Sequence, residues 1–371
     1  MMKQVFFLSG LCLLLFFSSF TPFTAMDSDE LFLYDTIDFR PVGCTLPSLV
    51  IHNPYDEVDF SSCHHYKANL HTHTTQSDGT SFPSEVIYHY HDVGSYDILA
   101  ITDHNKNTWP WSEFIDEHAE YCSSSSAFYP DLGMLAVSGN EFSLGHHRSS
   151  LLNDYPFGGF FMHFVFWYVQ QQDGVSFFNH PGRYGYDADW YQQFFDRYDS
   201  VVGIEVYNQG DRYDQDRLLW DEINRNRDPD DLIWGFSNDD MHRIHLQAFR
   251  NYQHLLMDEL SEDEFRDALS DGAFSFSYEP DGANMSSSSY GEALTPKLID
   301  VTINGSKIQL TAEEYDNVEW YDEDSQIIGT NTTVDVSMVE STFVRAVFSN
   351  DFGWTYTQPF GLEKDGVFDA V

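Results

Sequence analysis

The chain has 371 residues, of which 42% are hydrophobic and 17% aromatic. This length and composition allow a large folded core and argue against general disorder. The chain has 18 basic and 60 acidic residues, and the resulting formal net charge of −42 repels nucleic acid and anionic lipid headgroups. We therefore expect no nucleic-acid partner.

The first 25 residues have the pattern of an export signal peptide. Lys3 gives a basic start, residues 5–17 are nearly all apolar, and Ala25 precedes a polar segment. The alternative is a membrane anchor, but the apolar run is shorter than the roughly 20 residues that a membrane span needs. We therefore expect a secreted or periplasmic protein with no membrane partner after signal cleavage.

Residues 26–64 form an acidic, proline-interrupted lead-in, in which Cys44 and Cys63 are a possible disulfide pair. Beyond it, apolar runs alternate with stretches of helical period. Strands with their following loops are predicted at residues 66–73, 96–105, 133–143, 175–183, 200–208 and 232–242. Helices are predicted at residues 83–94, 159–174, 214–226 and 260–274. This alternation favours an α/β domain over residues 65–279, built as a parallel β/α barrel or a layered sheet.

The last of these helices has the clearest ends, because Ser261 and Glu264 are spaced as a capping box and Gly272 is a stop signal. From residue 294 to 362 the helical period is lost, and short apolar runs alternate with turn residues. This pattern is typical of a small, immunoglobulin-like β-sandwich.

Polar side chains follow nearly every apolar strand of the α/β region, at the strand ends where active sites collect in β/α barrels. His71 and His73 are two apart in an extended segment, so both imidazoles point to the same side. Histidine and carboxylate are ligands for zinc, manganese and iron. A single His-x-His pair is more often structural, but its repetition at successive strand ends favours a metal site. The further candidates are Asp78, Asp103, His104, Glu141, His146, His147, Asn179, His180, Asp239, Asp240 and His242.

The stretches "HTHTTQSDG", "ITDHN", "GNEFS", "FFNHPGR" and "NDDMH", in this order, resemble the PHP (polymerase and histidinol phosphatase) superfamily of metal-dependent phosphoesterases. The resemblance covers about residues 65–275. It implies a distorted seven-stranded, TIM-like β/α barrel that holds two or three divalent metal ions, such as Zn, Mn or Fe, at its strand ends. The closing stretch "RAVFSNDFGWTYTQPF" resembles the end of the β-sandwich that follows the barrel in many exported relatives.

Carried over motif by motif, the resemblance implies nine metal ligands: His71, His73, Asp78, His104, Glu141, His147, His180, Asp240 and His242. His147 is preferred over His146 because its offset to Leu151 fits the family better. The family often has histidine where Asp78 stands, and an aspartate there could change the metal preference. Three ions would leave the pocket with roughly +3 after the three carboxylates are counted, and such a centre attracts phosphate.

These features predict a secreted hydrolase that cleaves small phosphate esters with a metal-activated hydroxide. Arg183 is a candidate phosphate clamp, although it could equally pair with a surface acid. Asp103 could orient a ligand, and Asp239 could do the same or act as a general acid. Two alternatives stay open: a carboxylic ester hydrolase at the same metal site, and a non-catalytic binding protein that uses the β-sandwich. The substrate and the oligomeric state are not predicted.

Overall fold

The computed structural model describes residues 48–114, 133–154, 161–282 and 294–364. All of them belong to one compact unit, Pro47–Val371. The expected signal peptide, Cys44 and most of the lead-in lie outside the described residues. None of the helices in the described part of the chain combines the length and apolar character that crossing a bilayer requires.

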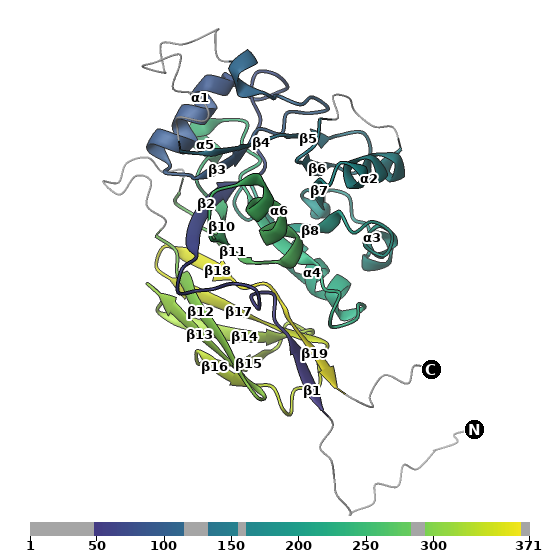
Figure 1. Cartoon of the computed structure of the whole chain (residues 1–371), viewed down its shortest axis with the longest axis vertical. Coiled ribbons are helices and arrows are strands. Elements are labelled where there is room, and N and C mark those ends of the chain that lie inside the picture. Colours follow the sequence, from purple (N-terminus) through teal and green to yellow (C-terminus); the bar gives the residue numbers. More distant parts are fainter. Residues whose placement is uncertain (1–47, 115–132, 155–160, 283–293, 365–371) are drawn as a thin grey trace, which may run out of the picture. The chain divides into compact units, whose positions relative to one another are not determined.

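The helices all precede the C-terminal strands that begin at Lys297 (Figure 1). They are α1 (Pro83–Tyr88), α2 (Met162–Gln171), α3 (Ala188–Phe195), α4 (Asp216–Arg225), α5 (Ile244–Gln247) and α6 (Glu262–Asp271). A π-helical turn, His89–Val93, extends α1. The capping signals of α6 are confirmed: Ser261 Oγ accepts a hydrogen bond from the Glu264 amide, and Gly272 ends the helix at φ +76°. The structure adds α3, which the sequence analysis did not predict.

The strands of the α/β region form parts of two sheets. They are β2 (His64–Asn69), β3 (Ile98–Ala100), β4 (Leu135–Val137), β5 (Gly139–Phe142), β6 (Arg148–Leu151), β7 (Val175–Phe178), β8 (Val201–Asn208), β9 (Trp234–Asn238), β10 (Asn251–Met257) and β11 (Phe274–Tyr278). Strands β5 to β9 form one five-stranded sheet in sequence order, and β11-β10-β2-β3-β4 are consecutive in an eleven-stranded sheet. Helices α2 and α3 contact β7 and β8, on the right of Figure 1.

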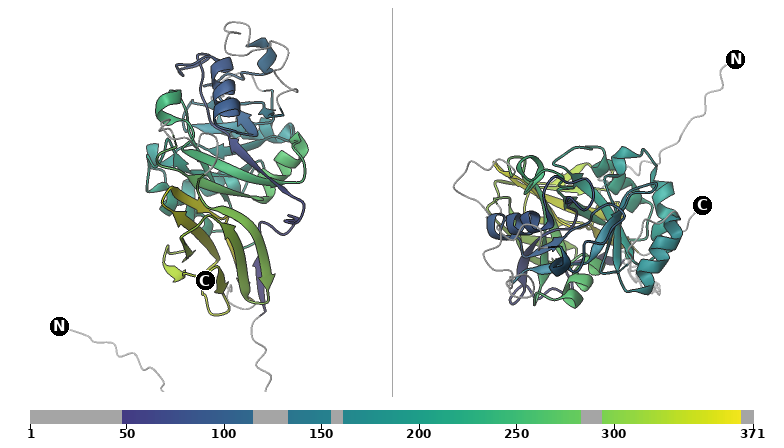
Figure 2. Two further views of the ribbon diagram at one scale, coloured as in Figure 1. Left: turned by 90° about the vertical axis from the view of Figure 1, so that its left-hand side faces the viewer. Right: turned by 90° about the horizontal axis from the view of Figure 1, so that it is seen from above.

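The remaining strands build the C-terminal region, which contains no helix among its described residues (green to yellow in Figure 2). They are β12 (Lys297–Asn304), β13 (Lys307–Glu313), β14 (Asn317–Asp322), β15 (Ile327–Gly329), β16 (Thr333–Asp335), β17 (Phe343–Asn350), β18 (Gly353–Tyr356) and β19 (Phe360–Lys364). β12, β13 and β16 form a three-stranded sheet, and the others extend the eleven-stranded sheet through the β11–β18 pairing. The lead-in adds β1 (Leu49–His52), which pairs antiparallel with β19.

The structure is therefore a mixed α/β fold followed by a β-rich region. The ladders between the described strands do not close into one continuous barrel. Two isolated parallel bridges nevertheless join the sheets where strands end, between Thr72 and Met241 and between His104 and Glu141. The predicted strand 133–143 is divided between the sheets, because β4 pairs with β3 whereas β5 pairs with β6. These crossings bring the carboxyl ends of β2, β3, β7 and β9 to one place.

Candidate metal centre

The first two histidines follow directly from the geometry of an extended chain. His71 and His73 lie just beyond β2, and Thr72 between them points the other way, donating from Oγ1 to the Ala100 carbonyl at 2.8 Å. Both imidazoles are fully buried, with their Nε2 atoms 3.1 Å apart. Asp240 Oδ1 lies 3.4 Å from Nε2 of His71 and 3.1 Å from Nε2 of His73. These three side chains form the first grouping that could hold a cation.

Glu141, at the third residue of β5, connects three more histidines. Its Oε1 lies 2.9 Å from Nδ1 of His147 and 3.2 Å from Nε2 of His180. Its Oε2 lies 2.9 Å from Nδ1 of His104 and 3.3 Å from Nε2 of both His71 and His73. Glu141 therefore belongs to two groupings, one with His71 and His180 and one with His104 and His147. A carboxylate in this position can bridge neighbouring cations.

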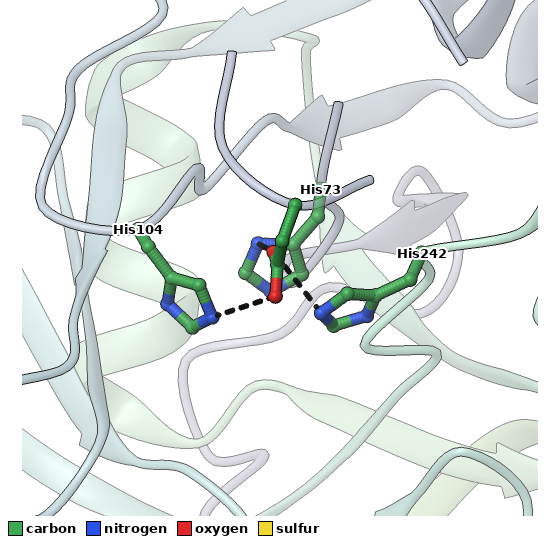
Figure 3. A group of neighbouring side chains, drawn as sticks. His73, His104 and His242 are labelled. Atoms are coloured by element: carbon green, nitrogen blue, oxygen red, sulfur yellow. Dashed lines mark ion pairs between the residues drawn. The ribbon is translucent and has the colours of Figure 1, made fainter. Parts of the chain in front are cut away.

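The fourth grouping opens toward solvent. The rings of His73, His104 and His242 surround one carboxylate, that of Asp78 (Figure 3). Asp78 lies 3.6 Å from Nε2 of His104 and 3.3 Å from Nε2 of His242, and its side chain is 55% exposed. The largely buried groupings around Glu141 thus continue into one that solvent can reach.

The contacts among these side chains leave some of their buried polar atoms without a hydrogen-bond partner. Nδ1 of His104, Nδ1 of His180 and Oε2 of Glu141 are buried without a hydrogen bond, although His104 Nδ1 lies only 2.9 Å from Glu141 Oε2. Nε2 of His71 and Nε2 of His73 face each other directly at 3.1 Å. Buried polar atoms are normally paired, so a set of converging lone pairs fits shared divalent cations.

A second carboxylate holds the first ligand in place from behind. Glu205, in the middle of β8, accepts a hydrogen bond from Nδ1 of His71 at 2.8 Å. It also accepts from the His180 amide at 2.8 Å and from the side chains of Asn208 and Asn238 at 2.9 and 3.0 Å. The Nδ1 contact leaves the Nε2 lone pair of His71 directed at the cluster, which is how outer carboxylates orient metal-binding histidines.

The electrostatics of the cluster favour a cation. Burial lowers the pKa of His73, but hydrogen bonds and charge from Asp240 and Glu141 outweigh it and raise the pKa to about 9. Burial likewise lowers the pKa of His71, yet the carboxylates of Glu141, Glu205 and Asp240 hold it well above its usual range. In turn, burial raises the pKa values of Glu141 and Asp240, but His71 and the other histidines of the cluster outweigh it and hold both pKa values well below normal. The carboxylates therefore draw positive charge into the site, as protons or as metal ions.

The structure distinguishes the two neighbouring histidines. His147 contacts Glu141, whereas Nδ1 of His146 lies 2.7 Å from the His147 carbonyl and its Nε2 lies 2.7 Å from the Tyr191 hydroxyl. His146 also packs on the ring of Trp190, with 5.4 Å between centroids. Of the two, only His147 belongs to a grouping that could hold a cation among the described residues.

The two candidate acidic helpers accept hydrogen bonds from neighbouring segments of the fold. Asp103 accepts hydrogen bonds from Thr74 Oγ1, Ser77 Oγ and Thr108 Oγ1 at 2.6–2.7 Å, so it braces the loop after His73 instead of contacting a ligand histidine. Asp239 is fully buried. Burial raises its pKa to about 6. It accepts from the Tyr90 hydroxyl and from the amides of residues 249–251, so each of its two oxygens has two donors within the fold.

Arg183 lies close to the centre but outside it. It ends a short 3-10 helix, Pro181–Arg183, and its guanidinium lies over the Tyr184 ring at 5.7 Å. Among the described residues it forms no ion pair.

Sequence reasoning missed Glu205, Asn179 as a partner of Glu141, and Gln209. Asn179 Nδ2 donates to Glu141 Oε1 at 2.9 Å, and Gln209 Nε2 donates to Asp240 Oδ2 at 3.2 Å. A usable signal existed for Glu205, because it is a lone acid inside the fully buried strand "VVGIEVYN". The role of Gln209 had no such signal, since it follows β8 as an ordinary loop residue.

A cavity of about 880 Å³ lies at the amino ends of β8 and β9, away from the cluster. Its ionisable lining consists mainly of carboxylates, and no metal-binding grouping lies there among the described residues. The chemistry of the side chains therefore places the site at the carboxyl ends of the strands.

No family model and no curated protein matches this chain. Among solved structures, it is similar to a two-domain protein of Bacteroides vulgatus that contains a predicted PHP-like metal-dependent phosphoesterase. That match has 16% identity and a TM-score of 0.46, and it covers 83% of this chain and 89% of the other. A candidate metal-dependent phosphoesterase of Bifidobacterium adolescentis is also similar, at 16% identity and a TM-score of 0.38, with 55% of this chain and 96% of that one covered.

A third similar structure is Endonuclease Q in complex with a 27-mer duplex that has an abasic lesion at the active site. The identity is 12% and the TM-score 0.38, with 56% of each chain covered. The match thus spans about half the length of Endonuclease Q.

Proposed function

We propose that this chain is a PHP-like metal-dependent phosphoesterase. The supporting observation is the convergence of six histidines and three carboxylates from distant parts of the sequence into four groupings that share ligands. Sharing is what distinguishes this cluster from separate structural histidines: His71, His73, His104 and Glu141 each belong to two groupings. Neighbouring cations within one pocket suit the hydrolysis of a phosphate ester.

Each residue of the cluster has a definite part in this proposal. His71, His73 and Asp240 would hold one cation, Glu141 would bridge to a second, and Asp78 with His104 and His242 would complete the solvent-facing position. Bound divalent cations would supply a water of lowered pKa and stabilise charge on the phosphate oxygens. Glu205 keeps His71 in the binding tautomer, and Asp103 holds the loop that carries Ser77 and Asp78.

We extend the proposal to features that the sequence suggests. Residues 1–25 are a cleaved signal, and the mature protein acts outside the cytoplasm on small phosphorylated molecules, without a nucleic-acid or membrane partner. Two or three Zn, Mn or Fe ions occupy the centre. Residues 65–279 form a distorted seven-stranded barrel domain and residues 294–362 an immunoglobulin-like sandwich.

The proposal is tested by metal analysis of the purified protein together with a phosphatase assay. We expect two or three equivalents of metal, hydrolysis of a phosphate monoester, loss of activity with a chelator, and recovery on adding back the metal found. A carboxylic ester with the same leaving alcohol should be a poorer substrate. Metal-loaded protein that cleaves the carboxylic ester and leaves the phosphate ester intact would contradict the proposal.

A further inference from the structure

The chain contains three Arg-Tyr dipeptides: Arg183-Tyr184, Arg197-Tyr198 and Arg212-Tyr213. In each, the guanidinium lies over the following tyrosine ring, with the Cζ atom 5.1–5.7 Å from the ring centroid. The three arginines are exposed and form no ion pair with any described carboxylate, although acidic residues outnumber basic ones by 60 to 18. Their unpaired charge calls for an explanation in so acidic a protein.

Two of the three dipeptides flank the candidate metal centre. The Tyr184 ring lies 6.0 Å from the ring of His180 and 5.9 Å from that of His147, and its hydroxyl accepts a hydrogen bond from the His147 amide at 3.1 Å. The Tyr213 ring lies 6.4 Å from that of His180. The rings of Tyr184 and Tyr213, which lie on two neighbouring loops, are therefore both close to the ring of His180.

Arg212 is also connected to the centre by hydrogen bonds. Its Nη1 donates to Oε1 of Gln209 at 3.0 Å. Nε2 of the same Gln209 donates to the backbone carbonyl of Asp240 at 2.9 Å and to its Oδ2 at 3.2 Å, while Oδ1 of Asp240 faces His73. Gln209 thus fixes the orientation of Asp240, a proposed metal ligand. It also connects the Arg212 guanidinium to Asp240 through two successive hydrogen bonds.

The two loops pack against each other at Gly182. A Cβ on this residue would lie 2.6 Å from Asp216 Oδ1 and 2.8 Å from Tyr213 Cβ, distances that real Cβ atoms do not adopt. Gln215 donates from Nε2 to the Gly182 carbonyl at 3.4 Å. The absence of a side chain at position 182 therefore allows the loops that carry Arg183 and Arg212 to lie side by side.

We propose that Arg183 and Arg212 bind a second anionic group of the substrate, one that belongs to the leaving alcohol. This inference rests on the proposed phosphoesterase function and names its substrate class: small phosphate esters whose alcohol carries a further phosphate or a carboxylate. Guanidinium groups bind both anions with paired hydrogen bonds, and each tyrosine ring restricts the guanidinium above it. The positive charges of Arg183 and Arg212 offset the repulsion between a doubly anionic substrate and the acidic protein surface.

The test compares three alkyl phosphates on the full-length, metal-loaded protein. Glycerol 1-phosphate has a neutral leaving alcohol, 3-phosphoglycerate adds a carboxylate, and 1,3-propanediol bisphosphate adds a second phosphate. We expect kcat/KM for at least one doubly anionic ester to exceed that for glycerol 1-phosphate by about tenfold or more, and the ester preferred identifies the second group. Arg183→Gln and Arg212→Gln should each reduce this ratio by about tenfold, mainly through KM.

Arg197→Gln is the matched control, because Arg197 has the same contact with its tyrosine but precedes β8, at the other end of that strand. It should leave all three kcat/KM values unchanged, and all variants should retain the wild-type metal content. Hydrolysis of the three esters at similar kcat/KM, or an equal loss in Arg197→Gln, would overturn the inference while leaving the phosphoesterase assignment intact. If metal-loaded protein hydrolyses none of them, the proposed function fails and the substrate class fails with it.

Discussion

Two buried, charged assemblies in this protein differ in how their charges are satisfied. Arg345 of β17 and Asp221 of α4 form a bidentate ion pair, from Nε to Oδ1 and from Nη2 to Oδ2, both at 2.8 Å. Ser325 also donates to Asp221, and the rings of Trp220, Tyr321 and Tyr356 surround the guanidinium. Each charge of this pair faces its opposite.

The metal cluster is buried except at Asp78, His104 and His242, and its charges are balanced differently. Its six histidines and three carboxylates face one another, and none of the three carboxylates forms an ion pair with a described lysine or arginine. A buried ion pair of opposite charges ties two regions of the fold together, whereas a buried excess of acceptors calls for a cation. This difference distinguishes a structural ion pair from a candidate functional site, and four experiments test the distinction.

The largest expected effect comes from removing the shared histidines. His71→Ala combined with His73→Ala should abolish metal binding and phosphatase activity together, because these side chains serve three of the four groupings. Metal content by elemental analysis and the rate of phosphate release measure the two losses. His245→Ala, an exposed histidine outside the groupings, should change neither. Wild-type metal content in the double variant would remove the basis of the proposed site.

The second experiment breaks the ion pair. Arg345→Met leaves Asp221 buried without its partner, and we expect the free energy of unfolding to fall by about 3–5 kcal/mol. Denaturant unfolding of the metal-loaded protein measures this loss. Adding Asp221→Leu should restore most of it, because no unpaired charge then remains. The exposed pair Arg225–Asp324 is the control, and Arg225→Gln should cost at most about 1 kcal/mol. Similar losses in both single variants would contradict this account.

The third experiment weakens the support behind the cluster. Glu205→Gln keeps the size of the side chain but removes the carboxylate that accepts from His71 Nδ1. Outer partners of this kind contribute about 10- to 100-fold to metal affinity, so we expect a loss in that range with the fold preserved. Competition with a chromophoric chelator measures the affinity. Unchanged affinity would mean that Glu205 is only part of the core.

The smallest expected effect is a pH dependence of the stability of the metal-free protein, which bound metal should remove. In the metal-free protein the pKa of His73 is raised to about 9, above its ordinary value of about 6.5, by Asp240 and Glu141 against the opposing effect of burial. A raised folded-state pKa stabilises the protein below about pH 6.5, and this contribution is lost as pH rises through 9, by at most about 1.4 kcal/mol per pH unit. Metal-loaded protein holds His73 deprotonated and lacks this loss. Melting temperatures of chelator-treated and metal-loaded protein between pH 6 and 9 should therefore have different slopes, and parallel slopes would contradict the prediction.

Local patterns predicted local structure well. Ser261, Glu264 and Gly272 predicted the two ends of α6, because caps act through neighbouring backbone atoms. The two-residue spacing of His71 and His73 likewise placed both imidazoles on one side of the chain. The helix α3 was missed even though Asp187 caps it, accepting a hydrogen bond from the Trp190 amide, and its buried residues Ala188, Tyr191, Phe194 and Phe195 have a helical spacing.

Strand pairing and contacts between residues far apart in the sequence could not be predicted from local patterns. The division of residues 133–143 into β4 and β5 depends on pairing with β3 in one sheet and β6 in the other. The hydrogen bonds of Asp103 and Asp239 involve hydroxyl and amide donors up to 149 residues away. The sequence shows where the acidic residues are, but it does not show which hydrogen-bond donors their carboxylates contact in the fold.

The sequence by itself determined that this protein is acidic, alternates strands and helices before a strand-rich region, and places histidines and carboxylates after its apolar strands. Those features depend on composition and on periods of two to four residues. The contacts of Glu141 with residues at four other strand ends, the place of Glu205 behind His71, and the rings of Tyr184 and Tyr213 beside His180 depend on the tertiary structure. Such relations arise when side chains far apart in sequence are brought within a few ångströms, and no local period encodes which ones will meet.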